Sequence, residues 1–280
     1  MPRGGAAGGP PVTGRPPAPR ARTRARATAA SAALLAAVLL GGCAQSVDPI
    51  ERLGKKAALE VRRNHPHGPA SATYRRWGLS APLAPAPRPP ARGGLRRDRT
   101  GLVPVVGRVP TRDRVVFLTY DDGAERDPRF VDMVRELRLP VSMFLTDSVV
   151  GPGYGHFARL REVGASVQNH TLDHASLRGL PYAGQRAEIC GQQEKLKARF
   201  GIRPRLFRPP YNTYDTTTLR AAADCGVSAV VLGREADGHR LHPGDILSGL
   251  DRPNLTAATI RLLRRIQAEG FTPARLENYV

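Results

Sequence analysis

The sequence has no apolar run long enough to cross a membrane as a helix, and no internal repeat is evident. Its main apolar run, residues 27–40, is about 12–14 residues long, whereas a spanning helix needs about 20. A solenoid needs a period of roughly 20–50 residues. These two absences exclude a membrane-spanning run of ordinary length and a repeat architecture. A chain of 280 residues then has room for one or two globular domains.

Acidic residues are scarce near the N-terminus. Residues 1–110 hold 19 Lys and Arg against 4 Asp and Glu, whereas residues 111–280 hold 24 against 20. A nucleic-acid-binding domain would carry its basic excess on the folded part of the chain. The segment from 111 onward looks folded and its charges are nearly balanced. Most of the net charge of +19 therefore lies outside the folded segment, and this location argues against a nucleic-acid partner.

The N-terminal stretch is typical of an export signal. Residues 15–26 are basic and contain no acid, the apolar run follows, and the sequence LLGGC then ends at Cys43. This order resembles a bacterial lipoprotein signal peptide, here residues 1–43, whose cysteine becomes lipidated and starts the mature chain. It predicts an exported protein held by a lipid on Cys43 at the outer face of the bacterial cell membrane. An ordinary secretion signal with a chance cysteine is the alternative.

Two cysteines, Cys190 and Cys225, remain once Cys43 is set aside. An even pair in an exported protein can form a disulfide, because that compartment is oxidising. Two buried thiols are the alternative, since the sequence does not show whether the two Cα atoms come within bonding reach.

Residues 44–110 show no sustained hydrophobic periodicity. A helix-like patch lies at 48–63, and the stretch SAPLAPAPRPPARGG at 80–94 is rich in Pro, Ala, Arg and Gly. Such a composition is typical of an extended spacer, so 44–110 is predicted to be a largely disordered linker. Trp77, the single tryptophan, leaves open that this region packs on the folded domain instead.

From residue 111 the sequence alternates between strand and helix patterns. Buried-strand runs are separated by helical segments of about 10–15 residues, which predicts βα units around a parallel sheet or barrel. Residues 111–280 are enough for one sizeable core. The expected strands are 115–120, 141–146, 165–170, 205–210, 227–233 and 244–250, with a short one near the C-terminus, and the expected helices are 128–139, 156–164, 185–201, 216–226 and 256–270.

Polar stretches follow four of these strands: YDDG, NHTLDH, RPPYN and GREADGH. The carboxyl ends of parallel strands meet at one rim, so these stretches are expected to lie close together. In HTLDH, the four-residue spacing of His170 and His174 predicts two imidazoles on one face of a helical turn, able to bind a divalent metal. Two histidines and one carboxylate leave coordination positions open for water and substrate.

The order YDDG, HTLDH, RPPY resembles that of the polysaccharide deacetylase family, the NodB-homology domain or carbohydrate esterase family 4. The resemblance covers roughly residues 112–280, and three of the family's five motifs match closely. It implies an α/β fold, a distorted (β/α) barrel over 111–280, that removes N- or O-acetyl groups from amino-sugar polymers. It also implies a divalent metal cofactor, which in this family is often zinc.

The resemblance also implies roles for the first two motifs. Asp121 would be the general base, and Asp122, His170 and His174 would be the metal ligands. A carboxylate bound to a cation stays ionised, so its neighbour is left free to take a proton from the attacking water.

In the third motif, RPPYN, the resemblance implies two further catalytic residues. Arg208 would pair with Asp121 and orient it, and Tyr211 would present its backbone N–H to the developing oxyanion. The family often has glycine after this tyrosine. Asn212 is the next best residue if that position needs a positive φ.

The other two motifs depart from the family pattern. The fourth usually contains an aspartate that braces the arginine and a tryptophan at the acetyl pocket, whereas GREADGHR offers Asp237 or Glu235 and no tryptophan. The fifth usually carries a histidine as general acid; here Leu250 occupies that place without a gap, and Gly249 does with a one-residue gap. Losing a positioned general acid typically costs about 10²–10⁴-fold in rate. His239 and His242 are nearby candidates to replace it.

These observations predict a monomeric, metal-dependent hydrolase that removes acetyl groups from a peptidoglycan- or chitin-like polymer outside the cytoplasm. Two alternatives follow from the missing histidine. One is a degenerate deacetylase fold that binds glycan with little catalysis. The other is an O-acetyl esterase, whose alkoxide leaving group needs less help from an acid than an amine does.

Overall fold

The computed structural model describes residues 70–90, 100–122, 126–236, 238–248 and 254–280. All of them belong to one compact unit, Glu60–Val280. Within this part of the chain, no helix combines the length and the apolar character that a membrane span requires. The predicted signal peptide, with Cys43, lies outside the described residues.

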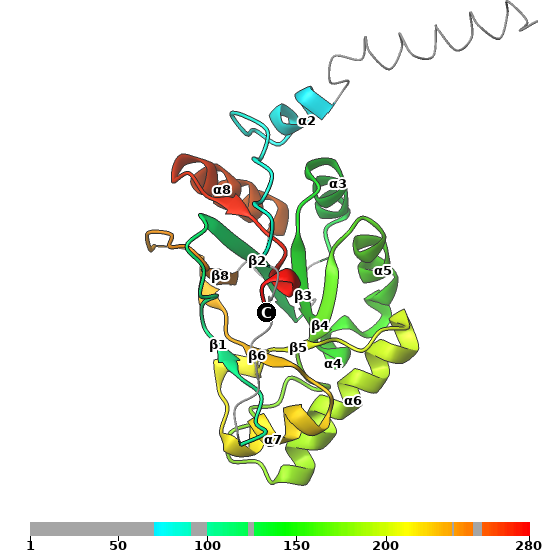
Figure 1. Cartoon of the computed structure of the whole chain (residues 1–280). Coiled ribbons are helices and arrows are strands. Elements are labelled where there is room, and N and C mark those ends of the chain that lie inside the picture. Colours follow the sequence, from blue (N-terminus) through cyan, green and yellow to red (C-terminus); the bar gives the residue numbers. More distant parts are fainter. Residues whose placement is uncertain (1–69, 91–99, 123–125, 237, 249–253) are drawn as a thin grey trace, which may run out of the picture. The chain divides into compact units, whose positions relative to one another are not determined.

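A sheet of nine strands forms the centre of this unit (Figure 1). Neighbouring strands pair in parallel in the order β1-β6-β5-β4-β3-β2-β8-β7, and β9 pairs with β2 beside this path. The predicted barrel class is confirmed, since the parallel sheet curves with helices around it. The strands are β1 Val105–Val106, β2 Val115–Asp122, β3 Val141–Leu145, β4 Ser166–Asn169, β5 Leu206–Phe207, β6 Ala229–Val231, β7 Arg234–Glu235, β8 Ile246–Ser248 and β9 Thr272–Pro273.

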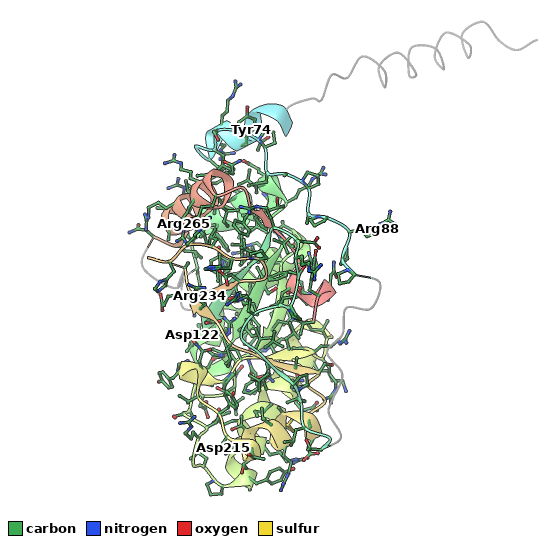
Figure 2. The ribbon with its side chains drawn as sticks, turned by 60° about the vertical axis from the view of Figure 1, so that its left-hand side comes forward. Tyr74, Arg88, Asp122, Asp215, Arg234 and Arg265 are labelled. Atoms are coloured by element: carbon green, nitrogen blue, oxygen red, sulfur yellow. A yellow bond between two sulfur atoms is a disulfide. The ribbon has the colours of Figure 1, made fainter. Side chains whose placement is uncertain are left out.

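Helices cover the outside of the curved sheet (Figure 1). The five long ones begin and end within three residues of the predicted bounds. Asp215, labelled in Figure 2, lies at the start of α7 and accepts a hydrogen bond from Thr218 N in a capping box. Gly201 ends α6 with φ 69°. The helices are α2 Ala70–Arg76, α3 Pro128–Leu137, α4 Asp147–Val150, α5 Tyr154–Glu162, α6 Tyr182–Phe200, α7 Thr216–Asp224 and α8 Leu255–Ala268.

Strand β2 is apolar on both faces, as a central parallel strand should be. Val116 and Leu118 pack into the core shared with α3, α5 and α8. Val115 and Phe117 face a second core inside the curve, where the C-terminal residues lie, and the Phe117 ring meets Tyr279 edge-on with centroids 5.1 Å apart. Only the last two residues of β2 are polar and partly exposed, so the strand delivers its carboxylates to the rim.

The segment after β1, at one edge of the sheet, is hydrogen-bonded to the segment before β8, near the other edge. Arg108 forms an isolated antiparallel bridge with Asp245, and Val109 N donates to Gly244 O at 2.9 Å. Gly244 has φ 82°, and a Cβ there would lie 1.9 Å from the Val109 carbonyl oxygen. A glycine is therefore required at this point of closure.

The folded unit begins earlier than the predicted boundary at residue 111. Helix α2 packs on α3, where the Glu136 carboxylate accepts hydrogen bonds from Arg76 at 2.5 Å and from Trp77 Nε1 at 2.7 Å. Trp77 is 4% exposed, and β1 belongs to the sheet. The alternative left open by Trp77, that this region packs on the folded domain, therefore holds for α2 and β1. Trp77 was the one sign of this packing in the sequence; the two-residue strand β1 gives no periodic signal and was not foreseen.

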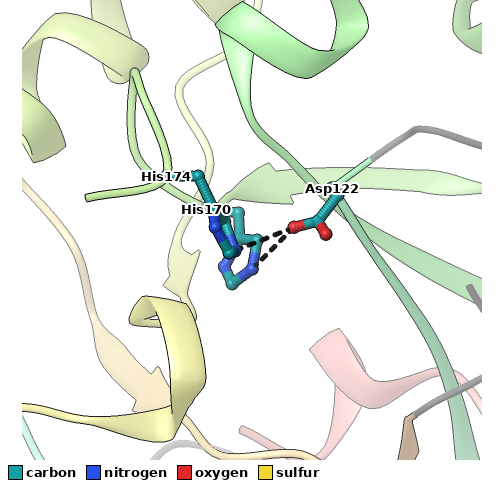
Figure 3. A group of neighbouring side chains, drawn as sticks. All are labelled: Asp122, His170 and His174. Carbon is teal, nitrogen blue, oxygen red and sulfur yellow. Dashed lines mark ion pairs between the residues drawn. The ribbon is translucent and has the colours of Figure 1, made fainter. Parts of the chain in front are cut away.

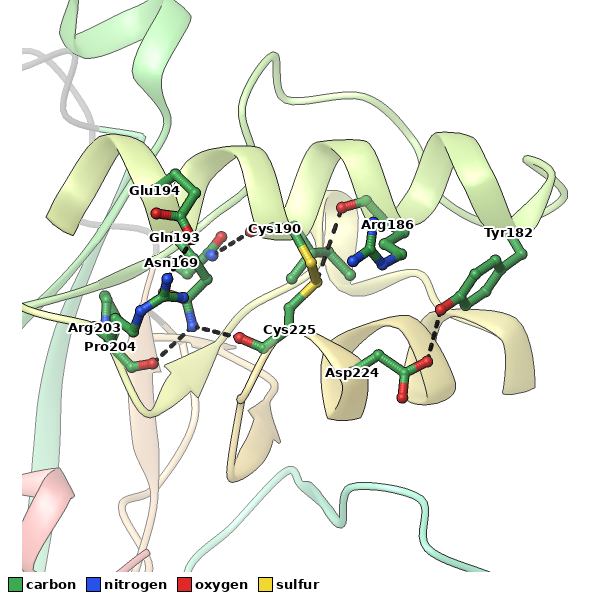
Figure 4. Close-up of a disulfide and its surroundings, with 11 residues drawn as sticks. Asn169, Tyr182, Arg186, Cys190, Gln193, Glu194, Arg203, Pro204, Asp224 and Cys225 are labelled. Carbon is green, nitrogen blue, oxygen red and sulfur yellow. Dashed lines mark hydrogen bonds and ion pairs between the residues drawn. A yellow bond between two sulfur atoms is a disulfide. The ribbon is translucent and has the colours of Figure 1, made fainter. Parts of the chain in front are cut away.

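Cys190 of α6 and Cys225, directly after α7, form a disulfide whose Cα atoms are 5.0 Å apart (Figure 4). The same two helices are joined by a hydrogen bond from Tyr182 to Asp224 at 2.6 Å. Gln193 of α6 donates to the carbonyl oxygen of Pro204 at 2.9 Å. Helix α6 is thus fixed at several points along its length.

Gly244→Ala is expected to destabilise the protein more than Gly226→Ala. Both glycines have nearly the same positive φ, 82° and 81°, which costs another residue about 1–2 kcal/mol. A Cβ on Gly226 would have nothing within 4 Å, whereas one on Gly244 would strike Val109. Urea unfolding, followed by the fluorescence of the buried Trp77, measures both losses. Equal losses would contradict a role for Gly244 in closing the sheet.

Replacing Cys190 and Cys225 together by alanine is expected to lower the free energy of unfolding by about 3–4 kcal/mol, because the bond closes a loop that is long in sequence. The separation is 35 residues. The measurement is denaturant unfolding with and without reductant. Reductant should bring the wild-type protein down to the double variant and leave the variant unchanged. A wild-type protein insensitive to full reduction would contradict a stabilising disulfide.

Candidate metal centre and active site

The residues singled out in the sequence gather at the carboxyl ends of neighbouring strands. Asp121 and Asp122 end β2, His170 directly follows β4 and Arg208 directly follows β5. The strands β2, β3, β4 and β5 are adjacent and parallel, so these ends share one edge of the sheet. Segments that are far apart in the sequence are thereby brought into one site.

Asp122, His170 and His174 face one another (Figure 3). Asp122 Oδ1 lies 3.2 Å from His170 Nε2 and 3.1 Å from His174 Nε2. One ligand atom of each residue lies within 4.8 Å of the other two. Two ligands of a tetrahedral zinc, each at about 2.0–2.1 Å, are about 3.3 Å apart, so the spacing of this group fits such an ion.

The hydrogen bonding of His170 also fits a cation. Its Nδ1 lies 2.7 Å from the carbonyl oxygen of Arg208, so this nitrogen donates and a neutral His170 directs the Nε2 lone pair toward Asp122. Asp122 Oδ1 is buried and accepts no well-aligned hydrogen bond from the described residues. A lone pair aimed at a carboxylate oxygen is repulsive unless a proton or a cation lies between them. The residues present therefore suit a divalent metal.

The electrostatics of the group follow from the same contacts. Burial by itself raises the pKa of Asp122, but the interactions with His170 and His174 outweigh it and lower this pKa well below its usual range. The contact with the Asp122 carboxylate raises the pKa of His174. The Asp122 carboxyl group is therefore held in its ionised form beside the two imidazoles.

The segment that carries the histidines is not the helical turn predicted from their spacing. Thr171 and His174 have φ values of 75° and 58°, in the left-handed region. Thr171 N donates to Asn169 Oδ1 at 2.9 Å, and His174 N donates to Thr171 Oγ1 at 3.1 Å. Side-chain acceptors fold this segment into a tight turn, so the prediction of a helical face was wrong. The turn nevertheless brings both imidazoles to Asp122.

Arg208 is 1% exposed and pairs with Asp121. Its Nη1 donates to Asp121 Oδ1 at 2.5 Å and to Thr119 Oγ1 at 2.9 Å, and its guanidinium carbon lies 4.2 Å from the centroid of the Phe144 ring. The side chain is therefore fixed by a charge, a hydroxyl group and an aromatic face at once. Asp121 is held at the rim next to Asp122, one of the three candidate metal ligands.

The turn after Arg208 places Tyr211 against His174. Their rings meet edge-on with centroids 4.9 Å apart, and Tyr211 is 67% exposed. Both Tyr211 and Asn212 have positive φ, 58° and 54°; the second was expected from the sequence and the first was not. The Asn212 side chain exchanges two hydrogen bonds with the backbone of Gly233, at 3.0 and 3.1 Å, which anchor the turn.

Two supporting residues of the sequence hypothesis, Asp237 and Leu250, lie outside the described residues. In the family pattern, the aspartate of the fourth motif braces the arginine, and the structure shows which atom of Arg208 is available for it. Nη2 of Arg208 is buried and has no hydrogen-bond partner in the described part of the chain. A Cβ on Gly233 would lie 3.0 Å from the guanidinium carbon, so this glycine leaves the arginine its space.

His242, one of the two histidines considered as a replacement acid, is far from this rim. Its backbone N–H donates to Asp245 at 2.9 Å, just before β8 begins. Strand β8 is parallel to β2, with Ile246 paired to Phe117. His242 therefore lies at the amino end of its strand, whereas Asp121 lies at the carboxyl end of the neighbouring one.

Thr146 supports two of the three candidate metal ligands and was missed in the sequence. Its hydroxyl group donates to the carbonyl oxygen of His170 at 2.8 Å, and its amide donates to that of Asp122 at 3.3 Å. It directly follows β3, whose position between β2 and β4 was not known in advance. The only signal in the sequence was that Thr146 follows a predicted strand. A threonine is common at such a position and does not mark a functional site.

The comparison with protein families agrees with this fold and site. The polysaccharide deacetylase family model matches residues 108–230, which include both aspartates, both histidines, Arg208 and Tyr211. The chain belongs to the polysaccharide deacetylase family.

Similar proteins include an uncharacterized protein of Streptomyces coelicolor, 60% identical over 215 residues that make up 70% of this chain and 86% of that protein. A chitin deacetylase of Amylomyces rouxii is 32% identical over 122 residues, 43% of this chain and 29% of the relative. The chain thus spans most of the first relative and under a third of the second. A carbohydrate esterase family 4 pseudoenzyme from Bacillus anthracis superposes with a TM-score of 0.57 at 17% identity, covering 62% of this chain and 68% of that one. This last likeness shows the fold alone.

Proposed function

We propose that the protein is a metal-dependent deacetylase of an acetylated amino-sugar polymer, of the peptidoglycan or chitin type, outside the cytoplasm. The observation that carries the proposal is the convergence of Asp122, His170 and His174 beside the Asp121–Arg208 pair. The name of the chitin deacetylase relative supports an amino-sugar substrate. The export signal and Cys43 support a protein anchored by lipid at the outer face of the membrane.

A divalent ion held by Asp122, His170 and His174, with zinc as our proposal, would polarise the acetyl carbonyl and lower the pKa of a water molecule. Asp121 lies next to this group on β2 and has the carboxylate to take the proton of the attacking water.

Arg208 and Tyr211 complete the proposed mechanism. The guanidinium of Arg208 keeps the Asp121 carboxylate in one orientation, because Thr119 and Phe144 fix the arginine in turn. The backbone N–H of Tyr211 lies in a turn anchored on Gly233 and is proposed to donate to the developing oxyanion.

The residue at the general-acid place favours one second candidate. The resemblance assigns this place to Leu250, or to Gly249 with a one-residue gap, and neither side chain can donate a proton to an amine leaving group. An alkoxide leaving group needs less help from an acid. An O-acetyl esterase is therefore the alternative activity of the same site. If the missing general acid abolishes turnover of both amides and esters, the protein binds glycan with little catalysis.

Asp122→Ala and Asp121→Asn are expected to separate metal binding from catalysis. Asp122→Ala should lose both bound metal and acetate release. Asp121→Asn should keep the metal and lower release by about 10²–10⁴-fold, because only the base is lost. The measurements are metal content per chain and acetate release from acetylated chito-oligosaccharides and peptidoglycan, with and without chelator.

Full metal content and full acetate release in Asp122→Ala would overturn the proposed site. Ester turnover without amide turnover would favour the esterase. Glycan binding without any turnover by the metal-loaded wild-type protein would rule out the enzyme and leave the binding protein.

A further inference from the structure

Helix α6 is hydrogen-bonded to the turn that carries the two proposed histidine ligands. The carboxylate oxygen Oε2 of Glu188 accepts hydrogen bonds from the backbone amides of Leu172 at 3.1 Å and Asp173 at 2.9 Å. The backbone carbonyl of Glu188 accepts a further one from Leu172 at 3.1 Å. These amides belong to two of the three residues between His170 and His174, so Glu188 holds the turn from its middle.

The neighbours of Glu188 on α6 hold the same segment. The carbonyl oxygen of Ile189 accepts from Asn169 Nδ2 at 2.9 Å, and Asn169 in turn accepts from the amide of Thr171. Gly191 allows the close approach, because a Cβ there would lie 3.3 Å from the Leu172 side chain. Three positions of one helical stretch therefore define where the turn lies.

The helix is itself immobilised next to these contacts. Cys190 is bonded to Cys225, and Gln192 Nε2 donates to the carbonyl oxygen of Leu145, at the end of β3, at 2.5 Å. A carboxylate carried on such a helix has a fixed position relative to β2, which bears Asp122.

We propose that Glu188 is a positioning residue of the metal centre: its carboxylate holds the turn so that His170 and His174 both point at Asp122. This inference rests on the proposed function, since it concerns the same metal. Glu188 touches the backbone of the turn and neither imidazole ring, so it acts through the ligands. Partners of this kind tune metal affinity by fixing ligand orientation. Without this carboxylate the amide of Asp173 would lose its acceptor, and the amide of Leu172 would keep only the backbone carbonyl of Glu188.

The test is a cobalt(II) titration of the full chain and of four variants: Glu188→Ala, Glu188→Gln, Glu188→Asp and Glu194→Ala. The last is the matched control, because Glu194 lies on the same helix and pairs with Arg203 at the surface. The readouts are the dissociation constant of Co²⁺, the visible absorption band of the bound ion, which reports its coordination, and the unfolding temperature.

Glu188→Ala is expected to weaken Co²⁺ binding about 10–100-fold and to alter the band. Glu188→Gln keeps an oxygen that can accept both amides and should stay within about threefold of the wild type, since geometry rather than charge is at stake. Glu188→Asp is one methylene too short to reach both amides and should also weaken binding. Glu194→Ala should bind as the wild type does.

Binding by Glu188→Ala equal to that of Glu194→Ala would overturn the inference and leave the proposed function standing. If Glu188→Ala does not fold, unchanged binding by Glu188→Asp overturns it instead. A wild-type protein that binds no Co²⁺ at neutral pH would overturn the proposed metal site, and the positioning role with it.

Discussion

The rest of the site depends on the contacts of one buried residue, Arg208. Its side chain holds Asp121, and its backbone carbonyl accepts the Nδ1 hydrogen of His170. One residue thus fixes the proposed base and the tautomer of a proposed metal ligand. Burying such a cation is costly unless it is paired, and Asp121, Thr119 and the Phe144 ring offset that cost. The parallel order of β2, β4 and β5 makes these contacts possible.

Around this centre the protein builds support in layers. Thr146 ties the backbones of Asp122 and His170 together, and Glu188 holds the turn between the histidines from the outside. The disulfide then fixes the helix that carries Glu188. Thr146 and Glu188 both bind backbone groups of the site, and so the side chains of Asp122, His170 and His174 are left to face one another.

Much of this could be predicted from the sequence, and the limits have physical causes. The long helices were predictable because apolar periodicity, caps and C-terminal glycines are local signals. The main strands were predictable in place but not in length, since β5, β6 and β8 are shorter than the apolar runs that contain them. The turn at 170–174 was predicted wrongly, because spacing alone does not show that Asn169 and Thr171 accept backbone hydrogen bonds there. Trp77 and Glu188 act through tertiary contacts with Glu136 and with the turn, and no pattern along the chain marks such partners.

The central claim is that Asp122, His170 and His174 form one metal site. Anomalous diffraction at the zinc absorption edge, from crystals of the zinc-loaded protein, tests it most directly. The expected result is a single strong peak within about 2.0–2.2 Å of an Asp122 oxygen and of both Nε2 atoms. A zinc-loaded crystal with no peak among these three residues, or with its peak on other ligands, would contradict the claim.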